Sequence, residues 1–248
     1  NRNLVIESDL RSEYDSVKVL VLDGDGKEVF SKNIVDYQLG MNTISYFMEI
    51  QEMIDVNVQI KSYHSEREYK SANKEIRLYP IKNPQISYIN VFENINQDFA
   101  NDIMYIDTIS GLDIIALQSP HPYPNYRQLY SMLLTPIIVA DTNPIFSYED
   151  IAIVEIGDSS SIFGDPRFYD YVVVEYTKNG FDWLPLFDGY DARFSEDWIQ
   201  TYYQSGSIAD SLFKTHTFNF HDELNERDTI LLRFRLYDVQ YSNGWSWA

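Results

Sequence analysis

The sequence predicts an all-β protein made of two consecutive β-sandwiches, the second of which carries one short helix. Short runs of β-branched and aromatic residues alternate with polar residues along most of the chain, and turn-forming residues separate them. Twenty tyrosines and 14 phenylalanines against only 10 glycines supply large side chains for such sheets. The helix is expected at Ser195–Gln204, where Ser195 can cap the first turn and two acids follow it.

The first sandwich is expected over residues 1–80. Two β runs, Val17–Leu22 and Glu28–Ile34, are joined by the turn residues Asp23–Lys27, and Val56–Lys61 alternates strictly between apolar and polar side chains. About six strands of this kind are typical of a small Ig-like or fibronectin-like sandwich. A boundary is expected at Tyr79–Pro84, because two prolines there stop strand pairing and favour an extended linker.

The second sandwich is expected over residues 85–248. Candidate strands are Leu112–Gln118, Leu129–Leu134, Ile137–Val139, Ile145–Tyr148, Ala152–Glu155, Tyr171–Thr177, Trp183–Leu186, Phe213–Phe220 and Thr229–Tyr237. Asn179-Gly180 suits a two-residue hairpin turn after Tyr171–Thr177. Along Thr229–Tyr237, alternation turns Arg233 and Arg235 outward. The residues that it turns inward are Ile230, Leu232, Phe234 and Leu236. Eight or nine antiparallel strands of this length predict a jelly roll.

Charge and composition exclude several classes of protein. The formal net charge is −19, from 38 acids and 19 bases, so the chain repels phosphate backbones and anionic lipid head groups. Binding to nucleic acid and direct membrane insertion are therefore disfavoured, and no apolar run is long enough to span a bilayer. The absence of cysteine excludes disulfides, thiolate zinc sites and a cysteine nucleophile.

Several ordered segments carry a family resemblance. They are SGLDIIALQSPHPYP, LLTPIIV, FYDYVVVEYTKNGFDWLPLFDGYD, a tryptophan-containing loop and DTILLRFRLYDVQYSNGWSWA. In this order they resemble the MAM-like, concanavalin-like jelly-roll modules of secreted and cell-surface proteins of the Bacteroidota, over roughly residues 90–248. Residues 1–80 resemble only a generic Ig-like neighbour. The resemblance implies an extracellular or outer-membrane cell-surface location and export by the type IX secretion route.

The family's GWGWA-like motif usually continues into a further strand, whereas this sequence stops at Ala248. We therefore expect the final strand to be absent and one sheet edge to be open to a partner strand.

No catalytic motif accompanies these strands. Gly157–Ser161 is serine-rich but lacks the G-x-S-x-G elbow, and His121 sits in a proline-rich loop without a catalytic partner nearby. His216 and His221 have a spacing that places them on opposite faces of a regular strand. The candidate acids for glycoside hydrolysis are Glu149, Asp150, Glu155 and Glu175, and nothing in the sequence sets their separations. The sequence is thus read as noncatalytic.

Acids and aromatics of the second sandwich supply two candidate sites. Loop aspartates at 158, 165, 170, 188, 191 and 197 predict a calcium site, with Asp188, Asp191 and Asp197 as the candidate ligands. The alternatives are a solvated acidic surface or an Asx turn at 188–191. Tyr190, Trp198 and Tyr202 are the candidate ligand-binding aromatics for a sugar platform.

The alternative for the aromatics is structural. Trp183 is expected to pack between the sheets, and Trp198 and Tyr202 have the i, i+4 spacing that anchors a helix.

The function expected from these features is a noncatalytic spacer, adhesion or protein-interaction portion of a larger cell-surface or secreted protein. A carbohydrate-binding module and an accessory domain of a secreted peptidase are the alternatives. Partners are then a protein or glycan at the cell surface, or other domains of a larger chain.

Overall fold

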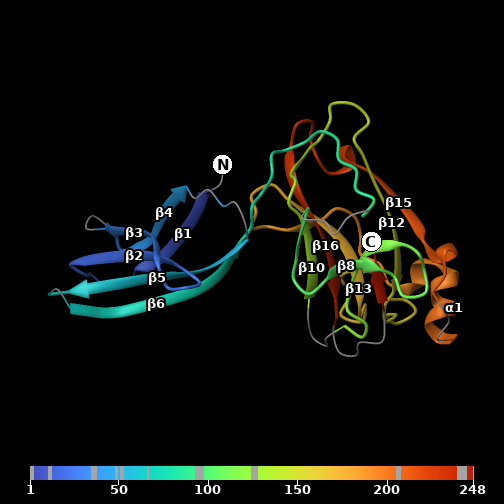
Figure 1. Ribbon diagram of the computed structural model, residues 1–248, viewed down its shortest axis with the longest axis horizontal. Coiled ribbons are helices and arrows are strands. Elements are labelled where there is room, and N and C mark those ends of the chain that lie inside the picture. Colours follow the sequence, from blue (N-terminus) through green and yellow to red (C-terminus); the bar gives the residue numbers. More distant parts are fainter. Residues whose placement is uncertain are drawn as a thin grey trace. The chain divides into compact units, whose positions relative to one another are not determined.

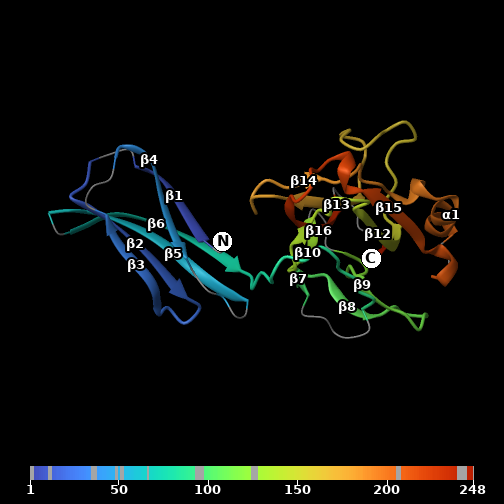
Figure 2. The same ribbon diagram turned by 90° about the horizontal axis from the view of Figure 1, so that it is seen from above.

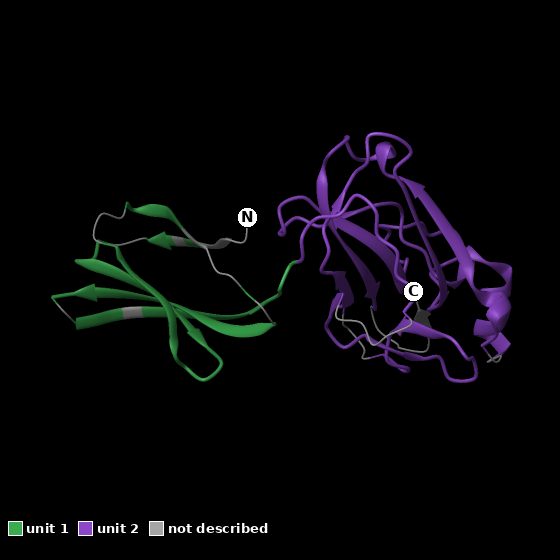
Figure 3. Ribbon diagram, turned by 45° about the horizontal axis from the view of Figure 1, so that its top comes forward, with its two compact units in different colours: residues 1–81 green, residues 82–248 purple. Residues whose placement is uncertain are grey.

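The computed structural model describes residues 3–10, 13–34, 38–47, 50, 53–65, 67–92, 98–123, 128–204, 208–238 and 245–247. The chain divides into two compact units, residues 1–81 and 82–248 (Figure 3). The all-β class is confirmed, because every strand ladder is antiparallel and α1 (Glu196–Gln204) is the one α-helix among the described residues. The assignment of the units as Ig-like and jelly-roll stays a prediction.

Unit 1 is built from two antiparallel sheets. One pairs β1 (Asn3–Leu10) with β4 (Gly40–Phe47). The other has the order β3-β2-β5-β6, formed by β3 (Glu28–Ile34), β2 (Ser16–Asp23), β5 (Ile54–His64) and β6 (Arg67–Leu78). Both sheets contribute to one core, whose buried members are Ile6, Val19, Val21, Ile44, Val56 and Val58. The alternation along Val56–Lys61 therefore does mark a strand with one buried face.

The larger sheet of unit 2 has six strands in the order β14-β13-β16-β10-β7, and β11 also pairs with β16. Figure 2 shows β14, β13, β16, β10 and β7 in this order. The strands are β7 (Phe99–Asn101), β10 (Gln128–Leu133), β11 (Ile137–Ile138), β13 (Tyr171–Thr177), β14 (Leu184–Pro185) and β16 (Thr229–Tyr237).

The second sheet has five strands in the order β15-β12-β17-β9-β8. They are β8 (Tyr105–Thr108), β9 (Ile115–Gln118), β12 (Ile145–Ile153), β15 (Lys214–Asn219) and β17 (Trp245–Trp247). Three 3-10 turns, η1 (Ala192–Phe194), η2 (Asp210–Leu212) and η3 (Phe220–Asp222), complete the unit. The helix α1 lies beside β12 and β15 (Figure 1).

The two sheets of unit 2 share a core. Leu129, Val172 and Leu236 of the six-stranded sheet belong to the same buried cluster as Leu117 and Ala152 of the five-stranded sheet. Of the four residues of β16 expected to face inward, Ile230, Leu232 and Leu236 are buried, and Phe234 is partly buried and packs against the same core. Burial of a large aliphatic side chain contributes about 1.5–3 kcal/mol, so these cross-sheet contacts hold the sandwich together.

Several expected strands have different bounds in the structure. Ile145–Tyr148 and the first two residues of Ala152–Glu155 belong to one strand, β12, which pairs with β15 and β17 and ends at Ile153. Asp150, between the two expected strands, is buried rather than exposed. The connection between β13 and β14 spans residues 178–183, which is longer than the two-residue turn expected at Asn179-Gly180. Gly180 does have a positive φ of 82°, and Asn179 Oδ1 accepts hydrogen bonds from the backbone N–H groups of Phe181 and Asp182, both at 2.9 Å.

The C-terminal motif does not lie at a sheet edge. β17 is flanked by β12 on one side and β9 on the other, with Ile151 opposite Trp247 and Ile153 opposite Trp245. The expected absence of a further strand after the motif, with one sheet edge left open, stays a prediction. Gly244 and Ala248 of the motif lie outside the described residues.

Candidate binding face

The outward face of the six-stranded sheet carries a compact group of charged and aromatic side chains. β13, β16 and β10 run side by side, with Glu175 opposite Arg233 and Tyr130 opposite Arg235 in the strand register. Since alternate residues of a strand point to opposite faces, these side chains lie on the face away from Leu232 and Leu236. We call the group the Arg-aromatic face; its members are Tyr130, Tyr171, Glu175, Trp183, Arg233, Arg235 and Tyr237.

Glu175 is the centre of the face. Its Oε2 accepts a hydrogen bond from Arg233 Nε at 2.6 Å, and its Oε1 accepts one from Arg235 Nη2 at 2.8 Å. The Glu175 side chain is only 5% exposed, against 19% for Arg233 and 13% for Arg235. A carboxylate at this depth needs these partners, because an unpaired buried charge costs several kcal/mol.

Aromatic rings enclose both guanidinium groups. Arg233 Cζ lies 4.2 Å from the ring centroid of Trp183 and 5.8 Å from that of Tyr130. Arg235 Cζ lies 5.6 Å from the centroid of Tyr171 and 5.9 Å from that of Tyr237. These distances fall within the range of cation–π contacts, so the rings fix the planes of the two guanidinium groups.

Trp183 therefore does not pack between the sheets, as was expected from the sequence. It precedes β14 and stacks on Arg233, on the face opposite the sandwich core, and it is only partly buried. The physical reason is that Arg233 offers a delocalised cation on this face, and tryptophan is the ring that such a cation binds best. Its exposed hairpin neighbours are Phe181, 72% exposed, and Leu184, 52% exposed.

A second polar group lies between the two sheets. Asp150 of β12 is 2% exposed; its Oδ1 lies 2.8 Å from His216 Nε2, and its Oδ2 accepts a hydrogen bond from the Tyr190 hydroxyl at 2.5 Å. The Tyr148 and Tyr190 hydroxyls are 2.7 Å apart. Because the Tyr190 proton is given to Asp150, Tyr148 is the donor of that pair. We call these four side chains the Asp150 network.

Burial governs the ionisation of the Asp150 network. It raises the pKa of Asp150 above its ordinary value, with His216 and Tyr190 acting in the opposite direction. Burial likewise raises the pKa values of Tyr148 and Tyr190, and the nearby Asp150 charge adds to both increases. His216 also stacks on the rings of Tyr148 and Tyr190, at centroid distances of 4.8 and 4.7 Å. The network thus joins the two sheets with hydrogen bonds inside an aromatic core.

The three candidate sugar-binding aromatics do not form an exposed platform. Trp198 is fully buried and donates its indole N–H to the Leu212 carbonyl at 2.7 Å, while Tyr190 is 8% exposed and bound to Asp150. Tyr202 is partly buried and packs against the same core. In this structure Trp198 and Tyr202 anchor α1, which is the structural alternative for them, whereas the aromatic rings of the Arg-aromatic face are partly exposed.

Two of the three candidate calcium ligands, Asp191 and Asp197, are each bound by other groups of the protein. Asp191 is buried, accepts the backbone N–H of Gly157 at 3.0 Å and pairs with Arg193. Asp197 pairs with Lys214 at 2.7 Å, and Asp188 is exposed. Among the described residues, no three acidic or histidine side chains are grouped closely enough to hold a metal ion. Calcium binding therefore stays a prediction, and the described residues contain no set of ligands for it.

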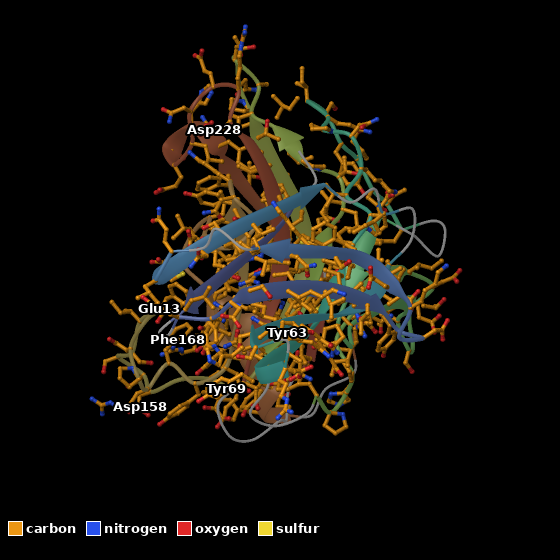
Figure 4. All side chains as sticks on the ribbon, turned by 90° about the vertical axis from the view of Figure 1, so that its left-hand side faces the viewer. Glu13, Tyr63, Tyr69, Asp158, Phe168 and Asp228 are labelled. Carbon is orange, nitrogen blue, oxygen red and sulfur yellow. The ribbon has the colours of Figure 1, made fainter. Side chains whose placement is uncertain are left out.

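Basic and aromatic groups also occupy the other loop aspartates. The Asp158 carboxylate accepts hydrogen bonds from Arg167 Nη1 and from the Tyr169 hydroxyl, both at 3.2 Å. Arg193 donates to the Asp158 backbone carbonyl and lies over the Phe168 ring, with Cζ 4.9 Å from the centroid. Figure 4 shows Asp158 and Phe168 at one end of unit 2, far from Asp228. Asp170 accepts the Tyr123 hydroxyl at 2.6 Å in the interior. These contacts give the acids of this loop a structural role, because each one closes a turn or ties a loop to the core.

The remaining candidates for chemistry are dispersed. His216 is buried on β15, whereas His221 is exposed in η3 beyond the end of that strand, and His121 is exposed. Of the four acids considered for hydrolysis, Glu149 bonds the Thr215 hydroxyl, Asp150 is buried, Glu175 is bound by arginines, and burial raises the pKa of Glu155. Ser161 donates to the Asp158 carbonyl at 2.8 Å, as a loop residue does.

The fold and this face define an all-β protein with antiparallel sheets and a partly exposed Arg-aromatic surface. No family model matches the sequence, and no curated protein matches it. A solved structure described as "Structural basis for the promiscuous specificity of the carbohydrate-binding modules from the beta-sandwich super family" aligns with 99% of this chain and 94% of its own, at 8% identity and a TM-score of 0.32. In the part of the chain that the structure describes, no helix has the length and apolarity to cross a membrane.

The sequence identifies both residues around which these groups are built, Glu175 and Asp150, but not the role that each has in the structure. Glu175 was considered only as a possible hydrolytic acid, although its strand position places it on the same face as the outward arginines 233 and 235. Glu175 meets these arginines only because β13 pairs with β16, and the contacting residues are nearly 60 positions apart in sequence. The partnership of Asp150 with His216 leaves no signal in the sequence at all, because it depends on the pairing of β12 with β15.

Proposed function

We propose that this chain is a noncatalytic binding module that holds a carbohydrate on the Arg-aromatic face. The observation that carries the proposal is the stacked array of Trp183, Arg233 and Tyr130 around Glu175, partly exposed on the outward side of a sheet. Aromatic rings contact the apolar C–H faces of sugars, and fixed planar polar groups bind their hydroxyls. A site of this kind binds without any nucleophile or general base.

The strands keep this surface rigid, which favours binding. β13 is paired on both sides, by β14 and β16, and β16 is paired on both sides, by β13 and β10. Rings and guanidinium groups that are already ordered lose little conformational freedom when a ligand binds. The extracellular, cell-surface setting expected from the family resemblance belongs to this proposal, and the full-length gene product, read for an export signal and for neighbouring domains, tests it.

A glycan array probed with the full chain tests the proposed activity. We expect selective binding to a class of oligosaccharide and its loss in Trp183→Ala. The matched control is Tyr203→Ala, which removes an aromatic side chain that is 66% exposed on α1, away from the Arg-aromatic face. Unchanged circular dichroism and an unchanged thermal unfolding midpoint exclude unfolding in either variant. Glycan binding that survives Trp183→Ala, or that disappears in Tyr203→Ala, would contradict the proposal.

Protein interaction is the second candidate, and a different observation favours it. Phe181 and Leu184 are 72% and 52% exposed, on the hairpin that carries Trp183. Exposed large apolar side chains grouped on one hairpin are typical of contact surfaces between proteins. Sedimentation velocity across a concentration series tests association with a second copy. A dimer that Phe181→Ser with Leu184→Ser abolishes, in a chain that binds no glycan, would favour this function.

A further inference from the structure

The Arg-aromatic face holds more positive than negative charge, in a chain whose net charge is −19. Arg233 and Arg235 share one counterion, Glu175, so the group carries one uncompensated positive charge. The guanidinium groups stay charged at every physiological pH. A neutral ligand that covered this face would remove water from the excess positive charge without replacing it, which costs free energy. A negative group on the ligand would pair with that charge and remove the cost.

The donors of the two arginines are only partly used. Arg233 donates to Glu175 through Nε, and among the described residues its two terminal amino groups have no acceptor. Within the same described part of the chain, Arg235 Nε is buried without a hydrogen-bond partner, and its Nη1 reaches Gln128 only at 3.4 Å. The edge of a guanidinium group that presents its terminal N–H donors matches the two oxygens of a carboxylate.

We propose that the carbohydrate bound by this face is acidic, a uronic acid polymer whose carboxylate is received by the terminal amino groups of Arg233. This inference rests on the proposed function and adds the chemical class of the ligand. Trp183 at 4.2 Å holds the plane of Arg233, so a carboxylate can bind the free edge in a fixed geometry while the sugar ring contacts the neighbouring aromatics.

The pairing of the strands favours a sugar over an acidic peptide. Peptides that bind sheets gain most of their affinity by adding a strand to an open edge. The strands that carry Glu175, Arg233 and Tyr130 are all internal, since β10 is itself paired with β16 and β7. A ligand on this face meets side chains only, which suits a polymer recognised through its rings and carboxylates.

The test is isothermal titration of the full chain with two matched probes. One is a hexamer of galacturonic acid, and the other is its methyl ester, which has the same rings without the negative charge. We expect the acid to bind at least about tenfold more tightly than the ester, and its affinity to fall as salt is raised. Because this comparison uses the wild-type chain, it does not depend on the folding of any variant.

Variants assign the binding to one residue. Arg233→Lys keeps the charge beside Glu175 but loses the planar pair of donors, so acid binding should weaken about tenfold. The matched control is Arg227→Lys, at a guanidinium that is 79% exposed and pairs with Asp141 away from the face. Tryptophan fluorescence checks that both variants are folded.

Each outcome separates the inference from the function on which it rests. Tight binding of the acid with the expected loss in Arg233→Lys supports both. Equal binding of acid and ester, or binding of neutral glycans alone, overturns the acidic class and leaves the carbohydrate function standing. Failure of every glycan overturns both. Binding of poly-glutamate as tight as that of the acid, with the same loss in Arg233→Lys, replaces the sugar by an acidic peptide and overturns both.

Discussion

The hydrogen bonds of the Asp150 network run in one direction, and this order predicts how its mutants combine. Tyr148 donates to Tyr190, and Tyr190 donates to Asp150, over 2.7 and 2.5 Å. Tyr190 is therefore the middle member of a chain inside the core, where it is 8% exposed. Removing its hydroxyl affects two partners, whereas removing the hydroxyl of Tyr148 affects one.

The magnitudes follow from the chemistry of each bond. Tyr148→Phe loses a hydrogen bond between neutral groups and should lower the free energy of unfolding by about 1 kcal/mol. Tyr190→Phe loses a bond to a carboxylate, worth about 1.5–3 kcal/mol, and leaves the Tyr148 hydroxyl without its acceptor, so about 3 kcal/mol is expected. In the double variant the Tyr148 hydroxyl is already gone. Its cost should thus stay near about 3 kcal/mol instead of reaching the sum of about 4 kcal/mol.

Urea unfolding followed by tryptophan fluorescence measures these energies. All four tryptophans lie in residues 82–248, so the signal reports the unit that contains the Asp150 network. Equal dependence on urea concentration in the four proteins is required for the comparison. Additive losses, or a loss in Tyr148→Phe as large as that in Tyr190→Phe, would refute the direction assigned to the chain of hydrogen bonds.

Three further predictions test other features. Because the folded pKa of Asp150 is raised, its contribution to stability is complete below its unfolded pKa of about 3.9 and is lost as pH rises through the folded pKa. Wild type should therefore lose stability relative to Asp150→Asn above about pH 4. Urea titrations across pH that show the opposite trend would contradict this. Glu175→Ala should lower the free energy of unfolding by about 3 kcal/mol in the same fluorescence measurement, because two mostly buried arginines lose their counterion. Glu175→Gln should lower it less. A loss under about 1 kcal/mol for Glu175→Ala would argue against the ion-pair geometry. Gly189→Ala should lower stability by about 1–3 kcal/mol in thermal unfolding, since its Cβ would lie 2.6 Å from Phe163. Gly24→Ala has nothing within 4 Å of the added Cβ and should change stability by less than about 0.5 kcal/mol. Equal effects would show that Phe163 moves aside at little cost.

Part of the candidate site could be anticipated from local patterns. The alternation along Thr229–Tyr237 places Arg233 and Arg235 outward, and the structure has them there. The same reasoning could not locate Trp183, because its side of the sheet depends on the course of residues 178–183 between β13 and β14. It also could not distinguish Trp198 from an exposed aromatic, since the helical spacing that it shares with Tyr202 suits a buried anchor and a surface platform equally.

The strand bounds show the same division. β12 is one strand through Glu149 and Asp150, although two adjacent acids interrupt an apolar run and read as a break. Asp150 is tolerated inside because β15, some 66 residues away in sequence, brings His216 within 2.8 Å. A buried acid is stable only when its partners are in place, and those partners come from other strands.

By itself the sequence determined the all-β class, the buried faces of β5 and β16, and the strongly negative net charge. These depend on side-chain periodicity, on turn residues and on charge counts, which are properties of neighbouring positions. The tertiary structure alone decided that Glu175 joins the two arginines, that Tyr190 meets Asp150, and which aromatics are exposed. Each of these contacts joins positions tens of residues apart, so it exists only when strands distant in sequence pair or when the two sheets pack together.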